Sequence, residues 1–291
     1  MEKKVIHLDK GNSFYRDQTI YFGTKHKKEE ALQPLLQEIG IHCLVSNIDT
    51  DQFGTFSGEI KRVDSIRKTL TQKINEVFKL NSHIQLALAS EGSFGPHPLI
   101  PFMYGNHETL LFVDKDKAIE IYVEDFNFHT NLKEIEINKG DEGLIEPFFT
   151  EIKFPDHAIM LKTSTDIFFK YTGIQDKKFV LNFINHNLTN NNKVIMATDM
   201  RAMFNPTRMN NIHQVGKKLV NSLQSYCPGC QMPGYSICEY VPGLECSLCG
   251  ADTNVIKEEI WNCKKCQFTE KKERKDQLKY ASPSECNYCN P

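Results

Sequence analysis

Hydrophobic residues recur along the first part of the chain at the spacing of strands and helices in turn. Residues 19–23 and 41–48 are rich in β-forming residues and predict two short strands. After each of them, apolar residues recur at the spacing of one helix face. The first predicted helix carries Ala31, Leu32, Leu35, Leu36 and Ile39, and the second carries Val63, Ile66, Leu70, Ile74, Val77 and Phe78.

The pattern of strands continues in the middle of the chain. Residues 84–89 form a continuous apolar run, which is typical of a strand buried on both faces, and a loop is expected at 90–97. Residues 109–113 and 118–123 predict an antiparallel hairpin, and 157–161 and 194–197 predict further strands. The last predicted helix carries Met209, Ile212, Val215, Leu219, Val220 and Leu223. This order predicts an α/β body with a mixed sheet over residues 1–225.

The composition changes near Tyr226, where Pro, Gly and Cys begin to interrupt the chain every few residues. We therefore expect a second, small domain over residues 226–291. Nine of the ten cysteines lie between Cys227 and Cys289, and eight of them form four Cys-x-x-Cys pairs. The remaining two, Cys43 and Cys238, are expected to be small buried residues.

Four such pairs match the requirements of zinc, which takes four thiolate ligands in a tetrahedron. A tail of this size with few large apolar residues also needs metal to fold. The sequence therefore predicts a double zinc ribbon with two structural zinc ions. Pairing the first knuckle with the second and the third with the fourth is preferred; joining the middle two, or interleaving them, stays open. A dithiol redox centre is disfavoured. The predicted zinc ligands are Cys227, Cys230, Cys246, Cys249, Cys263, Cys266, Cys286 and Cys289.

Charge and hydropathy narrow the possible partners and location. Lys and Arg number 35 against 37 Asp and Glu, a net charge of −2, which argues against binding nucleic acid by bulk charge. A basic cluster at 271–275 is interleaved with acids, so a solvated hairpin tip is favoured over a phosphate-binding patch. Nucleic acid is thus a possible partner but not a favoured one. The sequence shows neither a signal peptide nor a membrane span, and a cytoplasmic location is expected.

Three loops of the predicted body carry more functional side chains than turns require. Thr24, Lys25, His26 and Lys28 lie between the first strand and helix, where free amides favour an anion, although a solvated helix start is the competing interpretation. Asp49, Asp51 and Glu59 bracket a Gly-containing loop, and Glu91 follows a buried strand. Such carboxylates could hold Mg²⁺ against phosphate oxygens.

The third loop precedes the last helix. Arg201 and Arg208 are candidates for binding a substrate phosphate or base, and a structural pair between Arg201 or Arg208 and Asp199 is an equally good interpretation. Asn205 is counted among the substrate-binding candidates. Either Asn205 or Thr207 could instead cap the helix, with Pro206 as its opening signal.

Four segments and the cysteine tail together resemble a bacterial family of unknown function. These segments are Thr-Lys-His-x-Lys-Glu at 24–29, Asp-Thr-Asp-x-Phe-Gly-Thr-Phe-Ser-Gly-Glu at 49–59, Ser-Glu-Gly-Ser-Phe-Gly-Pro-His-Pro at 90–98, and Thr-Asp-Met-Arg-Ala…Asn-Pro-Thr-Arg-Met at 198–209. The resemblance covers nearly the whole chain and implies no known activity.

The order of elements over roughly the first 125 residues is also similar to the inosine/xanthosine triphosphate pyrophosphatase superfamily. Thr24 and Lys28 match its Thr-x-x-x-Lys phosphate loop, Glu59 its acidic loop, and Glu91-Gly92 its acidic glycine motif. Ser-Glu-Gly-Ser stands where Asp-Asp-Ser-Gly is common, Pro206-Thr-Arg208 replaces a Ser-His-Arg segment, and residues 130–190 have no counterpart.

This resemblance implies a nucleoside triphosphate pyrophosphatase fold and a Mg²⁺-dependent hydrolase of a nucleotide or related phosphate ester. Thr24, Lys25 and Lys28 would hold phosphates, and Glu59 and Glu91 would hold metal or orient water. The alternative is a non-catalytic nucleotide-sensing or interaction module whose zinc tail docks a protein or RNA.

Overall fold

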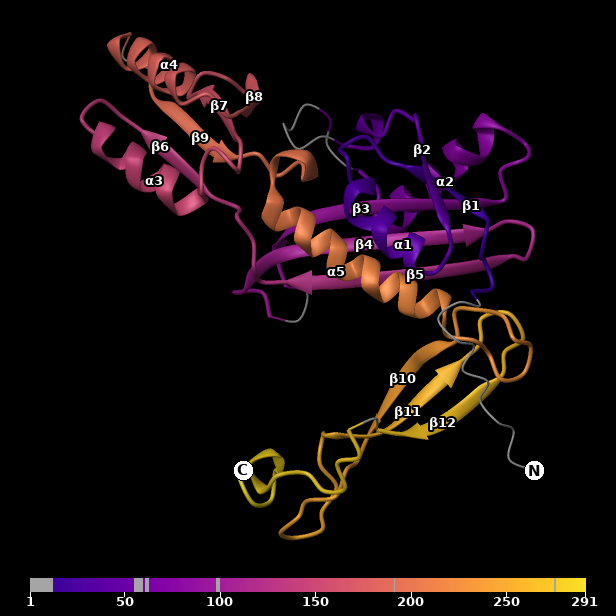
Figure 1. The fold of residues 1–291 in the computed structure, drawn as a ribbon. Coiled ribbons are helices and arrows are strands. Elements are labelled where there is room, and N and C mark those ends of the chain that lie inside the picture. Colours follow the sequence, from indigo (N-terminus) through magenta and orange to yellow (C-terminus); the bar gives the residue numbers. More distant parts are fainter. Residues whose placement is uncertain (1–12, 55–59, 61–62, 98–99, 191, 275) are drawn as a thin grey trace. The chain divides into compact units, whose positions relative to one another are not determined.

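The computed structural model describes residues 13–54, 60, 63–97, 100–190, 192–274 and 276–291 (Figure 1). The chain divides into two units. The larger comprises residues 15–116 and 122–220; the smaller comprises 221–291 with residues 117–121 and, among the described residues, 13–14. In this division the smaller unit begins at Asn221 and also includes residues 117–121.

Strands β1 to β4 and most of β5 belong to the larger unit, and the five strands form a mixed sheet in the order β2-β1-β3-β4-β5. Strand β1 pairs in parallel with β2 and β3, and β3 pairs antiparallel with β4. This confirms the predicted mixed α/β fold. The strands are β1 (Thr19–Gly23), β2 (His42–Ser46), β3 (Leu86–Pro96), β4 (Tyr104–Asp114) and β5 (Ile119–Asn127).

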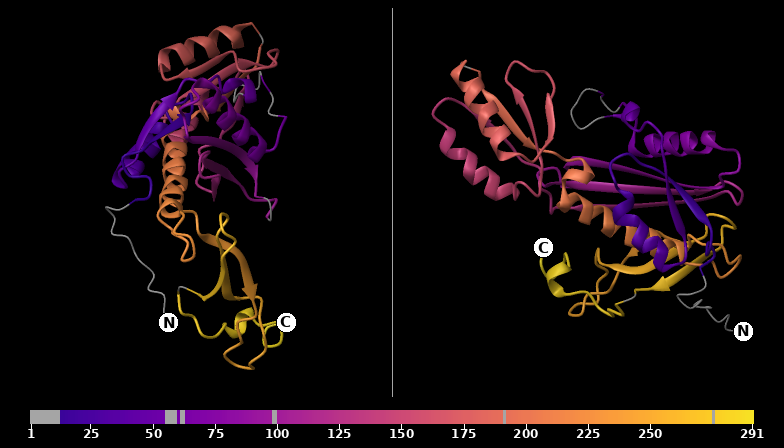
Figure 2. Two further views of the ribbon diagram at one scale, coloured as in Figure 1. Left: turned by 90° about the vertical axis from the view of Figure 1, so that its right-hand side faces the viewer. Right: turned by 45° about the horizontal axis from the view of Figure 1, so that its top comes forward.

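The central strand β3 is buried on both of its faces. Helix α2 (Ile66–Leu80) packs on Ala87 and Ala89, while Leu86 and Leu88 alternate to the opposite face and are buried as well. Helix α1 (Glu29–Glu38) connects β1 to β2, contains Pro34 and is shorter than α2 (Figure 2). Burial on both faces explains the continuous apolar run in the sequence.

Strand β3 continues through the segment where a loop was expected. It pairs with β4 as far as Pro96 and Tyr104, so the prediction of a loop at 90–97 is wrong. The cross-strand partners satisfy the backbone there although the side chains are mixed in polarity. Strand β1 ends at Gly23, opposite Ala89, and Ser90, Glu91 and Gly92 therefore lie beyond its end.

The second predicted helix begins later than its apolar pattern suggested. Ser65 is the N-cap of α2, and its Oγ accepts a hydrogen bond from the Lys68 amide at 3.3 Å. Val63 precedes this cap and is 92% exposed, so it does not belong to the helix face.

A second, antiparallel sheet is formed from residues 134–198 of the same unit. Its order is β6-β9-β7-β8, and α3 (Ile145–Ile152) and α4 (Lys177–Thr189) contribute to its core. The strands at 157–161 and 194–197 were predicted close to their observed positions, whereas the helices here were not predicted. The strands are β6 (Glu134–Ile137), β7 (Ile159–Thr163), β8 (Tyr171–Ile174) and β9 (Val194–Thr198).

The last helix of the body, α5, spans Pro206–Leu223. Its predicted core positions Ile212, Val215, Leu219 and Leu223 are buried. Across the described ranges, none of the helices combines the length and the apolar character that crossing a bilayer requires.

The smaller unit is built on an antiparallel sheet of β10 (Ser236–Pro242), β11 (Ile256–Asn262) and β12 (Thr269–Glu273). A small core of Tyr235, Trp261 and Phe268 packs around Cys227 and Cys263.

Candidate functional site

A cleft lies at the carboxyl end of β1, in the larger unit, and we call it the β1 cleft. Because β1 stops at Gly23 while β3 continues, the loop after β1 and the continuation of β3 line the same cleft. Its lining residues are Gly23, Thr24, Lys25, His26, Lys28, Thr50, Asp51, Gly54, Lys73, Ser90, Glu91, Gly92 and Arg208.

Lys28 is a buried basic residue of the cleft. Among the described residues, no carboxylate contacts it directly. Its side chain is buried, and its Nζ donates a hydrogen bond to Ser90 Oγ at 3.1 Å. Burial, together with the positive charge of Arg208, lowers the pKa of Lys28 to about 7. A buried amine with a neutral partner is therefore available to bind an anion.

The hydroxyl of Thr24 is a second polar group of the cleft that could contact a ligand. Its residue is 5% exposed, and its Oγ1 is buried with no hydrogen-bond partner among the described residues. Because a buried hydroxyl normally has a partner, this oxygen is a candidate contact for a ligand or a water molecule.

Lys73 and Glu91 also line the cleft. Lys73 Nζ donates to the Ser90 carbonyl at 3.1 Å and to the Glu91 carboxylate. Sequence reasoning missed Lys73, although the signal was present: it occupies the core face of α2, three residues after Leu70, where an apolar residue is expected.

Arg208 reaches the wall of the cleft from α5. Its Nε donates to Glu108 Oε1 at 2.7 Å and its Nη1 to the Met200 carbonyl at 2.5 Å, and the guanidinium lies over the Phe94 ring at 5.4 Å. The arginine is thus held within the protein, and its guanidinium contributes charge to the cleft wall. Glu108, its partner on β4, was also missed.

Asn205 does not line the cleft. It is fully buried, and its Oδ1 accepts a hydrogen bond from the Arg208 amide at 3.0 Å, which caps α5. The structure therefore shows Asn205 in the capping role that the sequence allowed.

Arg201 likewise has a structural partner. Its Nε lies 3.0 Å from Asp199 Oδ1 and its Nη2 lies 2.5 Å from Asp199 Oδ2, and the guanidinium stacks over Phe204 at 4.7 Å. It does not line the β1 cleft. Of the two interpretations of the Arg–Asp cluster, the structural pair describes Arg201.

The basic residues of the loop after β1 differ in whether a carboxylate contacts them. Lys25 Nζ contacts Asp49 at 2.8 Å and Asp51 at 2.7 Å, and these carboxylates raise its pKa. Burial and the charge of Lys28 lower the pKa of His26 to about 4, so this ring is neutral at pH 7. Lys28 is therefore the basic group of the loop that stays without a carboxylate contact, and with a pKa of about 7 it is about half protonated at pH 7.

Most of the residues expected to act together do converge. Lys28, Glu91 and Arg208 come from a loop, a strand and a helix far apart in the sequence, and all three line the β1 cleft. Glu59, the other expected catalytic residue, lies outside the described residues.

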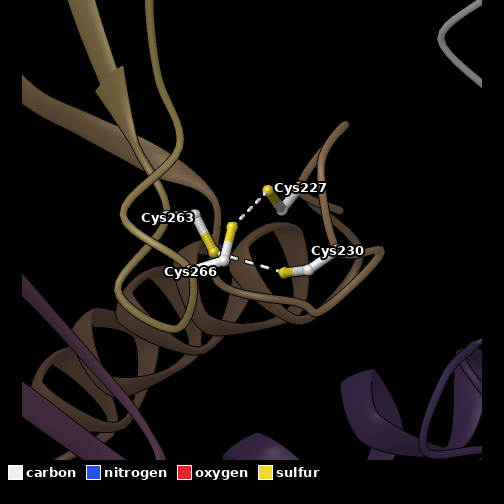
Figure 3. A group of neighbouring side chains, drawn as sticks. All are labelled: Cys227, Cys230, Cys263 and Cys266. Atoms are coloured by element: carbon white, nitrogen blue, oxygen red, sulfur yellow. Dashed lines mark hydrogen bonds between the residues drawn. The ribbon is translucent and has the colours of Figure 1, made fainter.

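The smaller unit contains two groups of four cysteines, and in each group the sulfur atoms lie within 4.8 Å of one another. In the first tetrad, Cys227 Sγ lies 3.6 Å from Cys266 Sγ, and Cys230 Sγ lies 3.6 Å from Cys263 Sγ (Figure 3). Four sulfurs at about 2.3 Å from a tetrahedral zinc are about 3.8 Å apart. Both tetrads therefore could hold a zinc ion.

The expected pairing of successive knuckles is wrong, and the interleaved alternative is correct. The first tetrad joins the first and third knuckles, and the second joins Cys246 and Cys249 to Cys286 and Cys289. The antiparallel sheet explains this. The end of β11 lies beside the start of β10, which brings the third knuckle to the first. The end of β12 lies beside the start of β11, at the end of the sheet where β10 stops, and this brings the fourth knuckle to the second.

The knuckles share one backbone turn. The amides of Gln231 and Gln267 each donate to the carbonyl of the cysteine four residues earlier at 2.9 Å, and both residues have positive φ. Amides also face the sulfurs, as where Leu248 N donates to Cys246 Sγ at 3.4 Å. Such hydrogen bonds lower the pKa of Cys246 to about 7, which favours the thiolate that a metal requires.

A comparison with curated protein sequences found no match. The family described as a domain of unknown function (DUF6671) matches residues 73–291. The matched range begins in α2 and includes Lys73, Glu91, Glu108, Arg208 and all eight tetrad cysteines, while the loop at 24–28 lies outside it. The chain belongs to this family of unknown function.

Proposed function

We propose that the protein is a Mg²⁺-dependent hydrolase that acts on a nucleotide or a related phosphate ester in the β1 cleft. The observation that carries this proposal is the buried Lys28 amine at the end of β1, which no carboxylate contacts directly among the described residues. Glu91 is paired with Lys73, Asp51 with Lys25, and Glu108 with Arg208. Lys28 donates to a neutral hydroxyl instead.

A phosphate group is the anion that suits this arrangement. It accepts several hydrogen bonds at once, and the amine of Lys28, the hydroxyl of Thr24 and the amine of Lys73 all line the cleft. Fixed donors that face a transferring phosphate also stabilise the charge of its transition state.

Glu91 is the carboxylate that we propose acts in the chemistry. Its side chain is 15% exposed and lines the cleft, so it can accept a proton from an attacking water or help to hold a metal ion. Asp51, which also lines the cleft, is the second candidate ligand. Each of these carboxylates contacts a lysine, so Mg²⁺ would have to displace that lysine or bind the carboxylate together with it. When bound, Mg²⁺ supplies charge stabilisation at the phosphate oxygens.

The test is a panel of nucleoside mono-, di- and triphosphates and simple phosphate esters, with Mg²⁺ or with EDTA. Release of phosphate and pyrophosphate is measured together with the shift in Tm. Glu91→Gln is expected to lower turnover by about 100-fold or more while binding remains, and Lys28→Met to abolish binding. Lys193→Met, at an exposed pair with Glu136, is the control. A chain that is neither active on nor stabilised by any member of the panel contradicts the proposal.

The second candidate is a non-catalytic nucleotide-sensing module. It is favoured by one observation: Lys73 already neutralises Glu91, which weakens that carboxylate as a base. In this case a nucleotide raises Tm equally in the wild type and in Glu91→Gln, and neither protein releases phosphate.

We further propose that the two tetrads hold structural zinc ions. The sulfur separations and the shared knuckle turns support this, as does the small core of the unit that carries them.

A further inference from the structure

The second tetrad is surrounded by large apolar side chains that face solvent. Leu248 and Tyr288, one from each of its two knuckles, are 74% and 80% exposed. Tyr280 is 57% exposed and precedes Ala281, which pairs with Cys246. These three residues lie within or next to the segments that carry the second tetrad, and we call them the second-tetrad patch.

The first tetrad shows that such exposure is not a general property of this unit. Its neighbours Tyr235, Trp261 and Phe268 pack against Cys227 and Cys263, and Tyr235 is only 3% exposed. Its knuckles carry Gly229, Lys264 and Lys265 between the cysteines, with no large apolar residue. The large apolar neighbours of the first tetrad thus pack against its cysteines, whereas those of the second tetrad are exposed to solvent.

The surroundings of the second-tetrad patch are acidic. Residues 244–254 and 276–291 contain Glu245, Asp252, Asp276 and Glu285 but only one basic residue, Lys279. Glu245, Asp252 and Glu285 are exposed. The nearby Arg274 is held by Asp276, with N–O distances of 2.9 and 2.6 Å. Four thiolates around one Zn²⁺ would add a further net charge of about −2.

We propose that the second-tetrad patch is a docking surface for a protein that presents apolar and basic residues. Exposed tyrosine and leucine side chains on a rigid turn are suited to an interface core, because they lose little conformational freedom on binding. The surrounding acids would attract a basic partner and repel the phosphates of a nucleic acid. This inference does not depend on the proposed hydrolase activity.

The experiment is a selection from a displayed random-peptide library on the full-length, zinc-loaded protein. The enriched peptides are then measured against three variants. Leu248→Ser/Tyr288→Ser removes the apolar contacts, Glu245→Lys/Glu285→Lys reverses the charge, and Phe102→Ser, at an 83% exposed aromatic of the larger unit, is the control. The zinc content of each variant is measured to show that the tetrads are retained.

Enriched peptides are expected to combine aliphatic or aromatic residues with Lys or Arg. Their affinity should fall by about tenfold or more in the first two variants and stay unchanged in Phe102→Ser. The proposal is overturned if no peptide distinguishes the wild type from the Leu248/Tyr288 variant, or if the peptides that do so are acidic. It is also overturned if single-stranded RNA binds through Leu248 and Tyr288.

Discussion

The guanidinium of Arg208 and the carboxylate of Glu108 form an ion pair inside the larger unit, with 2.7 Å between Nε and Oε1 and side-chain exposures of 1% and 2%. The pair joins the first turns of α5 to β4, across 100 residues of sequence. Asn106 also donates to Glu108, at 3.0 Å, and Met200 accepts from Arg208, so each charge has a second partner. A charge pair of this kind stabilises little by itself but becomes costly when one member is removed.

We therefore expect Arg208→Met to lower the free energy of unfolding by about 3–5 kcal/mol, because it leaves the Glu108 carboxylate buried without a counter-ion. Urea denaturation measures the change. The double variant Arg208→Met/Glu108→Leu should recover a large part of the loss, since neither charge then remains buried. If the double variant is as unstable as the sum of the two single variants, the pair is not coupled. Lys193→Met, at an exposed pair, should cost less than about 1 kcal/mol.

A second prediction concerns Gly92, which lies beside this pair. A Cβ at position 92 would meet the Arg208 guanidinium and would lie 2.6 Å from the Glu108 carboxylate oxygens. Gly92→Ala is expected to destabilise the protein by about 1–3 kcal/mol through overpacking. Gly95 is on the same strand, and a Cβ there would have no heavy atom of the described residues within 4 Å beyond its chain neighbours. Gly95→Ala is therefore the matched control and should be close to neutral. Equal effects of the two substitutions would contradict this explanation.

The third prediction concerns the pH dependence of stability at Lys28. Its pKa falls from the ordinary value of 10.5 in the unfolded chain to about 7 in the folded protein. Between these values the amine of the unfolded chain binds more protons than the amine of the folded protein does. The free energy of unfolding therefore rises with pH through this window. The destabilisation caused by burying the Lys28 amine is largest below pH 7 and becomes smaller toward pH 10. Lys28→Met should therefore be more stable than the wild type at pH 7, by about 1 kcal/mol or more, with a smaller difference at pH 9.

The same variant should lose phosphate binding, and urea denaturation at both pH values together with calorimetry measures the two effects. Ser90→Ala is the control, because it removes the hydroxyl partner of Lys28 but keeps the amine. The prediction is contradicted if Lys28→Met is less stable than the wild type at pH 7. It is also contradicted if the gain in stability is larger at pH 9 than at pH 7, because burial would then not lower the pKa of Lys28.

The fourth prediction distinguishes the pairing of the knuckles. Cys227→Ser/Cys263→Ser alters one tetrad only, and the protein should retain one zinc ion per chain. Cys227→Ser/Cys246→Ser alters both tetrads and should retain none or bind zinc far more weakly. Elemental analysis after gel filtration measures the content. If the two double variants swap these outcomes, or behave alike, the interleaved arrangement is wrong.

The sequence predicted the body of the fold where burial alone determines the pattern. The strands at 19–23 and 194–197 and the core face of α5 follow from apolar spacing, and they are confirmed. Residues 90–96 were mistaken for a loop because their mixed composition has no period of its own. Their strand conformation depends on hydrogen bonds to β4, which local sequence does not reveal.

The candidate site was predicted in part for the same reason. Lys28 and Glu91 stand at the ends of predicted strands, where ligands commonly bind, so their position in sequence was informative. Lys73 and Glu108 lie within a helix and a strand, and only tertiary pairing reveals what they contact. The knuckle pairing was missed because it depends on the direction of three short strands, which the cysteine spacing does not specify.

The interleaved tetrads have a consequence for the order in which metal binds. One site closes the chain from Cys227 to Cys266 and the other from Cys246 to Cys289, so residues 246–266 belong to both loops. Whichever ion binds first shortens the free chain that the other must close, and thereby lowers the entropy cost of the second event. The two ions should therefore bind with positive cooperativity, and neither half of the tail can be excised as an independent metal-binding module.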